Sequence, residues 1–303
     1  MVAARRGTAS LIDFGLLFWG VGKNMNERYP STVDPNDLPF RHYSLKHRLV
    51  SWVSQNLFDG ITYTARHGLI AGMKRKGGLG WLPIRPKATA EHQFWEKLDL
   101  RGQIIYDIGA FQGLLTIFFA NRGKHVVSYE PSSNNRARLM ENLRLNDIAN
   151  VTVRNVGLGS SRRSASLCFM PLMPGGASIE AHAIEGIQRF SHAVEEIPIT
   201  TLDEDIRDNG LPAPDFIKID IEGMESEALL GARQTLAEHP ALFLEMHGET
   251  INEKRRKVAE IVAILEEAGY RDITHVESSS RVTSSNTAVA VQGHLYCPSR
   301  SQS

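Results

Sequence analysis

The sequence predicts an α/β protein with a mostly parallel sheet that helices cover on both faces. Short apolar runs alternate with amphipathic helical patterns along most of the chain, which is the order of βαβ units. Polar side chains stand at the ends of several apolar runs, where open parallel sheets bind their ligands. With 42% hydrophobic residues among 303, the chain has enough apolar material for a sizeable core.

The clearest unit of this pattern spans residues 104–130. A first apolar run at 104–108, the first strand, ends in a turn that carries Gly109 and Gly113, an apolar helix follows at 114–120, and a second apolar run at 126–129 ends in Glu130. Glycine lets a backbone approach a ligand closely, and the start of the helix points free N–H groups at the same place. A carboxylate at the tip of the second strand can accept hydrogen bonds from two ribose hydroxyls. The unit therefore predicts a nucleoside-binding turn.

The composition of the turn favours S-adenosylmethionine over a dinucleotide. Its two glycines lie four residues apart and do not reproduce the G-x-G-x-x-G fingerprint. Asp107 precedes the first glycine by two residues, and an acid there does not help to bind a pyrophosphate but can pair with an ammonium group. S-adenosylmethionine carries an ammonium, a sulfonium and a ribose but no phosphate. Asp107 and Glu130 thus suit this cofactor better than NAD.

Residues 1–89 are predicted to form a partly helical N-terminal extension, and residues 90–303 the catalytic domain. Within the extension, apolar residues recur at helical spacing from 40 to 58 and again from 61 to 73. Nothing else in the extension covers this apolar face, so we expect the extension to dock on the catalytic domain.

Charge and cysteine content narrow the classes of function. Basic and acidic residues balance at 34 each, so no overall charge attracts nucleic acid or an anionic membrane. Cys168 and Cys297 form no metal-binding spacing, and a reduced, cytoplasmic protein is expected. The apolar run at 11–21 is interrupted by Asp13 and is too short to span a bilayer. We therefore expect no nucleic-acid partner and no integral membrane span, and the oligomeric state stays open.

The remaining elements follow from periodicity and from turn residues. Apolar residues at spacings of three and four, with Gly269 as a stop after the last helix, predict the helices. Helices are expected at 90–98, 134–146, 202–207, 224–236 and 254–268. Short apolar or alternating runs predict the strands. Strands are expected at 151–156, 166–170, 197–201, 216–221, 241–246, 270–276 and 287–291, with 294–297 extending or following the last. Loops are expected at 171–178 and 278–285.

Five segments together resemble the FkbM family of S-adenosylmethionine-dependent methyltransferases. They read YDIGAFQG, SYEPSSNNRARLMENLRLN, NVGLG, DFIKIDIEGMESEALLGA and LFLEMHG, and the resemblance covers about Glu91 to Pro298. It implies a Rossmann-like class I methyltransferase fold with seven strands, the last of them antiparallel. It also implies that Asn155 lies at the adenine and that Ser178 belongs to a loop over the active site.

The candidate catalytic residues are Asp220, Glu222 and His247. Asp220 and Glu222 flank the end of a predicted strand, and residues two apart point to the same side if the extended geometry persists. When two carboxylates lie close together, the pKa of one of them is raised, and that group can act as a general base. The pair could instead hold a divalent cation such as Mg²⁺, but the sequence gives no support for a metal. We assign no metal ligand. His247 is an alternative base.

Each of these three residues also has a structural interpretation. Asp220 then only contacts the cofactor's ammonium group, Glu222 only caps the following helix, and His247 is a satisfied structural histidine.

The predicted function is methyl transfer from S-adenosylmethionine to a hydroxyl oxygen. The family resemblance implies a small-molecule or carbohydrate acceptor, namely a sugar, a polysaccharide unit or a natural product; N-methylation stays open. No G-x-S-x-G elbow and no Cys/His signature occurs, and none is needed, because the sulfonium already activates the methyl group. The alternatives are an NAD-linked oxidoreductase or epimerase, and a non-catalytic ligand-binding protein with a methyltransferase fold.

Overall fold

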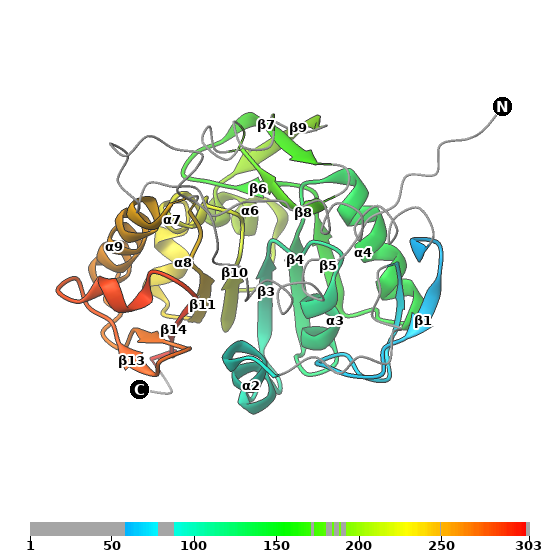
Figure 1. The fold of residues 1–303 in the computed structure, drawn as a ribbon, viewed down its shortest axis with the longest axis horizontal. Coiled ribbons are helices and arrows are strands. Elements are labelled where there is room, and N and C mark those ends of the chain that lie inside the picture. The colour runs from blue at the N-terminus through cyan, green and yellow to red at the C-terminus, as the bar shows by residue number, and fades with distance from the viewer. Residues whose placement is uncertain are drawn as a thin grey trace, which may run out of the picture.

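The structure is a computed structural model that describes residues 58–77, 88–170, 173–179, 192–248 and 250–300, with positions 184 and 188. Within these ranges the central sheet has eight strands (Figure 1). In spatial order they are β13 (Ser280–Arg281), β12 (Thr274–His275), β14 (His294–Cys297), β11 (Ala241–Glu245), β10 (Phe216–Ile219), β3 (Ile104–Ile108), β4 (His125–Tyr129) and β5 (Val151–Arg154).

The strands from β11 to β5 run parallel, and β14 is antiparallel to β11. The antiparallel last strand agrees with the sequence prediction, but the count of seven does not. The eighth strand is β13, where the serine-rich segment predicted as a loop turns back and pairs with β12.

Helices cover both faces of the central sheet (Figure 1). On one face lie α2 (Ala90–Lys97), α3 (Leu114–Ala120) and α4 (Ser133–Leu145); on the other lie α6 (Leu202–Asn209), α7 (Glu225–Leu230), α8 (Arg233–Ala237) and α9 (Ile251–Glu267). Strand alternation divides the core between the faces. In β10, Ile217 and Ile219 pack towards α7 and α9, whereas Phe216 packs towards the fully buried Trp95 of α2.

A second, four-stranded sheet lies over the carboxyl ends of the central strands (Figure 1). Its order is β6 (Gly157–Leu158), β9 (Ala193–Thr200), β7 (Arg163–Met170) and β8 (Met173–Ser178). The prediction of a loop at 171–178 is therefore wrong for most of that stretch, because β8 pairs antiparallel with β7. This sheet forms a roof over the edge where ligands of open α/β sheets bind.

Two further predictions are wrong for identifiable reasons. The helix expected at 224–236 is divided into α7 and α8 at Gly231. An added Cβ there would lie 2.1 Å from the carbonyl oxygen of Gly159. Asp203 caps the second helix by accepting hydrogen bonds from the N–H groups of Gln234 and Thr235. The strand expected at 287–291 is the short 3₁₀ helix η4 (Thr287–Ala290), because 294–297 supplies the pairing partner of β11 instead.

The described part of the N-terminal extension packs against α4. Instead of the helix predicted at 61–73, it forms an antiparallel pair, β1 (Thr62–Thr64) and β2 (Lys74–Lys76), since Gly68 and Gly72 between the strands adopt positive φ angles. Ion pairs join Asp59 to Arg138 at 2.7 Å and Lys76 to Glu141 at 2.6 Å. The helix predicted up to residue 58 lies almost wholly outside the described residues.

None of the helices in the described ranges combines the length and the apolar character needed to cross a membrane.

Candidate active site

The glycine turn after β3 is built for close packing. Gly109 has a φ of +81°, and a Cβ there would lie 1.8 Å from the carbonyl oxygen of Asp220. Gly113 has a φ of +84°, and its Cβ would lie 3.1 Å from the side chain of Leu139 in α4. The positive φ angles and the missing side chains therefore let this turn fit between the end of β10 and α4.

Glu130 organises the turn from the end of β4. Its two carboxylate oxygens accept hydrogen bonds from the N–H groups of Phe111, at 2.8 Å, and of Ser132, at 2.9 Å. Only 6% of the residue is exposed, and this burial raises the pKa of Glu130 to about 7, although both N–H groups act in the opposite direction. The carboxylate thus lies at the predicted strand tip and fixes the backbone around it.

A buried lysine links the glycine turn to the next strand. The Nζ atom of Lys218 lies 3.4 Å from Oδ1 of Asp107 and 3.2 Å from Oδ2 of Asp220, and it donates to the carbonyl oxygen of Gly109 at 2.9 Å. Asp107 is fully buried and also accepts a hydrogen bond from Thr116. Asp107 therefore has a protein cation as its neighbour. Lys218 is not among the predicted site residues, although a lysine inside an apolar strand is itself a signal.

An apolar cavity adjoins the turn beneath the second sheet. It is lined by Ile108, Gly109, Tyr129, Pro131, Val156, Gly157, Leu158, Leu167, Ala177, Ser178, Ile179, Ile197, Ile199, Ile221 and Met224. Ser178 is on this wall, and its hydroxyl donates to the carbonyl oxygen of Glu222. Asn155, the predicted adenine contact, is exposed and is not among the lining residues, whereas the three residues after it are.

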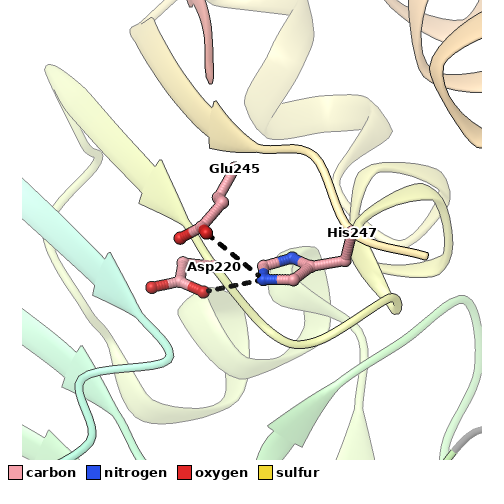
Figure 2. A group of neighbouring side chains, drawn as sticks. All are labelled: Asp220, Glu245 and His247. Carbon is pink, nitrogen blue, oxygen red and sulfur yellow. Dashed lines mark ion pairs between the residues drawn. The ribbon is translucent and has the colours of Figure 1, made fainter. Parts of the chain in front are cut away.

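Four carboxylates surround His247, and together with it they form what we call the His247 cluster: Asp220, Glu222, Glu225, Glu245 and His247. The Nδ1 atom of His247 lies 2.8 Å from Oε1 of Glu225. Its Nε2 atom lies 3.6 Å from Asp220, 3.6 Å from Glu245 and 3.9 Å from Glu222. Figure 2 shows the carboxylates of Asp220 and Glu245 pointing at this ring nitrogen from neighbouring strand ends.

The electrostatics of the cluster follow from this crowding. Burial alone would lower the pKa of His247, but the surrounding carboxylates, Glu225 foremost, raise it well above the usual 6.5. Burial alone would raise the pKa of Asp220, but Lys218 and His247 hold it below its usual value. Glu245 keeps 40% of its side chain exposed, yet partial burial and the charge of Asp220 raise its pKa to about 7. The surrounding carboxylates thus favour the protonated form of the imidazole.

The three predicted catalytic residues do lie together, but not for the reason given by the sequence. Strand β10 ends at Ile219, and Glu222 and Gly223 adopt φ angles of +53° and +106°, so extended geometry does not persist through Glu222. A turn brings the carboxylates to His247 instead. The sequence analysis also missed Glu225 and Glu245, although Glu245 stands only two residues before His247 at the end of a predicted strand.

A parallel sheet with an antiparallel last strand, a glycine turn after β3 and an acid after β4 defines a class I methyltransferase fold. The chain belongs to the methyltransferase FkbM domain family, whose model matches residues 107–271.

Named relatives agree with this assignment. The chain is 29% identical over 196 residues to methyltransferase sdnD of Sordaria araneosa, covering 56% of this chain and 74% of the relative. It is 25% identical over 172 residues to the hexuronic acid methyltransferase AglP of Haloferax volcanii, covering 51% and 66% of the two chains. The crystal structure of methyltransferase FkbM from Methylobacillus flagellatus KT matches with a TM-score of 0.42 and 21% identity, over 67% of this chain and 45% of the other.

Proposed function

We propose that this methyltransferase moves a methyl group from S-adenosylmethionine to a hydroxyl oxygen of a sugar, a polysaccharide unit or another small natural product. One observation carries the proposal: the turn suited to the cofactor and the proton-accepting His247 cluster are in direct contact, through Gly109 and the carbonyl of Asp220. The Haloferax relative, a hexuronic acid methyltransferase, supports the acceptor class.

The residues around the turn fit S-adenosylmethionine. The carboxylate of Glu130 accepts backbone hydrogen bonds from Phe111 and Ser132 and a side-chain hydrogen bond from Asn135, and a carboxylate has about four acceptor positions, so one is left for a ribose hydroxyl. The apolar cavity beside the turn suits an adenine ring. The Oδ1 atom of Asp107 is buried without a hydrogen-bond partner, and Lys218 neutralises its charge. When bound, the cofactor supplies a methyl group already activated by a positive sulfur.

The protein's own contribution is to orient the acceptor and to remove its proton. As the acceptor oxygen forms its bond to the methyl carbon, the carbon–sulfur bond breaks and its electrons stay on sulfur, while the hydroxyl proton goes to a base. The surrounding carboxylates raise the pKa of His247 and so favour its protonated form, and Asp220 is paired with Lys218, which makes both weaker candidates for the base. We assign the proton to Glu222, whose side chain is 19% exposed and whose backbone carbonyl is bonded to Ser178 on the cavity wall.

The test is incubation of the full chain with methyl-labelled S-adenosylmethionine and a panel of hydroxyl compounds that includes hexuronic acids. Mass spectrometry should detect label on an acceptor oxygen, and calorimetry should show binding of S-adenosylmethionine but not of NAD. Binding of S-adenosylmethionine without transfer to any compound in a host extract would favour the non-catalytic alternative. Binding of NAD alone would favour the oxidoreductase.

A further inference from the structure

Three side chains of the His247 cluster have the donor atoms of a metal site. Within the ranges that the structure describes, Asp220, Glu245 and His247 each offer one ligand atom, and these atoms all lie within 4.8 Å of one another. Glu245 is the last residue of β11, Asp220 directly follows β10 and His247 stands two residues after β11, so all three lie at the carboxyl ends of two adjacent strands. Figure 2 shows the two carboxylates converging on one nitrogen of the imidazole.

The orientation of His247 is set from behind by Glu225. That carboxylate is 1% exposed and lies 2.8 Å from Nδ1, and its Oε1 atom also accepts hydrogen bonds from the N–H groups of Ile221 and Gly223. A carboxylate bonded to the far nitrogen of an imidazole is the arrangement that orients metal-ligating histidines. It directs Nε2 towards Asp220 and Glu245.

On the Nε2 side of the imidazole, Asp220 and Glu245 are too far away for a hydrogen bond and leave a gap. Nε2 lies 3.6 Å from Asp220 and 3.6 Å from Glu245, which is longer than a hydrogen bond. A metal ion about 2.0–2.2 Å from each atom would bridge such a separation after small side-chain movements. Lys218 contacts the other oxygen of Asp220, so the Oδ1 atom faces the gap.

The charge around the gap also favours a cation. Four carboxylates lie within 4 Å of the ring nitrogens of His247, and Lys218 pairs with Asp220. His294 approaches Glu245 from the far side, at 3.9 Å, but is itself bonded to Glu277 at 2.6 Å. A cation between the three ligands would replace the proton of His247 and balance the remaining charge.

We propose that Asp220, Glu245 and His247 bind one divalent metal ion of the manganese or zinc type. An imidazole with two carboxylates favours such an ion, whereas the all-oxygen pair Asp220 and Glu222 considered for Mg²⁺ lacks the nitrogen donor. Glu222 is not a ligand of this ion and remains the proposed base. Resting on the proposed function, this inference adds that the ion contacts the acceptor oxygen and lowers the pKa of its hydroxyl.

Mn²⁺ binding to the chelator-treated full chain, without S-adenosylmethionine, tests the site directly. The six-line electron paramagnetic resonance signal of free Mn²⁺ should disappear with one ion bound per chain. Glu245→Gln and His247→Gln should each raise the Kd for Mn²⁺ at least ten-fold, and Glu225→Gln ten- to a hundred-fold through loss of orientation. Glu238→Gln, which removes an exposed carboxylate on another surface, is the matched control and should leave the Kd unchanged. Melting without metal confirms that each variant is folded.

The outcomes separate this inference from the proposed function. Absence of Mn²⁺ binding, or equal affinity in wild type, Glu245→Gln and His247→Gln, overturns the metal site, and methyl transfer by the chelated enzyme would then leave the proposed function standing. Binding that the ligand variants weaken supports the site even if no hydroxyl compound is methylated. Competition by Zn²⁺ at lower concentration than by Mg²⁺ supports the nitrogen-containing donor set, and preferential competition by Mg²⁺ contradicts it.

Discussion

Gly109 packs directly against the backbone carbonyl of Asp220, so that an added Cβ atom would lie only 1.8 Å from that oxygen. The turn expected to cradle the cofactor and the rim expected to carry the chemistry are therefore one packed unit. Lys218 strengthens the same contact, because its ammonium group bonds to the carbonyl of Gly109 and pairs with the carboxylate of Asp220. A change in the turn should thus be transmitted to the proposed site of methyl transfer.

This contact predicts that Gly109→Ala is far more damaging than its size suggests. The added methyl group would clash with the backbone carbonyl of Asp220, which cannot move aside as a flexible side chain could. The φ of +81° is also strained for alanine. We expect S-adenosylmethionine affinity to fall at least ten-fold, measured by calorimetry, with a clear fall in melting temperature. Gly109→Val should be worse, because a β-branched side chain is stiffer.

Gly102→Ala is the matched control for backbone strain alone. Gly102 has a similar φ of +74°, but nothing lies within 4 Å of an added Cβ. Its cost should be about 1–2 kcal/mol, with no effect on cofactor affinity. If Gly109→Ala behaves like Gly102→Ala in both measurements, the close approach at Asp220 is unimportant.

Glu130→Ala should weaken S-adenosylmethionine binding ten-fold or more. Hydrogen bonds to a charged group contribute roughly 1.5–3 kcal/mol each, and tenfold in Kd corresponds to about 1.4 kcal/mol. Calorimetry measures the Kd, and Glu130→Gln, which keeps the shape but not the charge, should lie between wild type and alanine. The carboxylate also holds the N–H groups of Phe111 and Ser132, so melting must show that each variant is folded. Unchanged affinity in a folded alanine variant contradicts the ribose role.

The pair His294–Glu277 predicts a loss of stability at alkaline pH. Burial alone would lower the pKa of His294, but the carboxylates of Glu277, Glu245 and Glu91 raise it to about 9. A histidine with a raised pKa stabilises the folded state fully below pH 6.5, and this contribution is lost as the pH rises through 9. The wild type should therefore lose more melting temperature than His294→Asn between pH 6.5 and 9.5.

Glu277→Gln should remove most of the same pH dependence, because Glu277 Oε1 lies 2.6 Å from the ring of His294. The expected difference is a few degrees, since 1 kcal/mol corresponds to roughly 2–4 °C in a domain of this size. Parallel melting curves for wild type and His294→Asn across this range would show that the pair carries no net stabilisation.

The sequence predicted the central strands and most of the helices because their patterns are local. The strand at 104–108 and the helix at 114–120 have the predicted bounds, since each is a largely apolar run, interrupted by Asp107 or Thr116, that lies between glycines. Errors arise where pairing partners decide the structure. Met173–Ser178 is a strand only because β7 lies beside it, and Thr287–Ala290 packs as a 3₁₀ helix because 294–297 has taken the strand position.

In the candidate site, too, the features set by local sequence could be predicted and those set by distant partners could not. Strand ends are visible in a sequence, so Glu130, Asp220 and His247 were all named as site candidates. The partners that control them are not visible, because Lys218, Glu225 and Glu245 act through contacts across strands and turns. Those contacts are the reason that we propose Glu222 as the base in place of Asp220 or His247.

Glu222→Gln is the variant that tests the proposed base. Loss of a general base lowers turnover by roughly 10²–10⁴. The cofactor's affinity should stay within about two-fold of wild type, because Glu222 lies on the His247 side of the turn and not at Glu130. The control variant Glu238→Gln should match wild type in both turnover and affinity.

Asp220→Asn should instead reduce both turnover and affinity, since Asp220 is bonded through Lys218 to the glycine turn. His247→Ala should lower turnover and cofactor affinity alike, because it removes the imidazole that lies among four carboxylates and destabilises the whole cluster. Single-turnover transfer of labelled methyl, with calorimetry of each variant, separates these patterns. If Glu222→Gln transfers methyl at the wild-type rate, the proton leaves to solvent or to another residue, and the assigned mechanism is wrong.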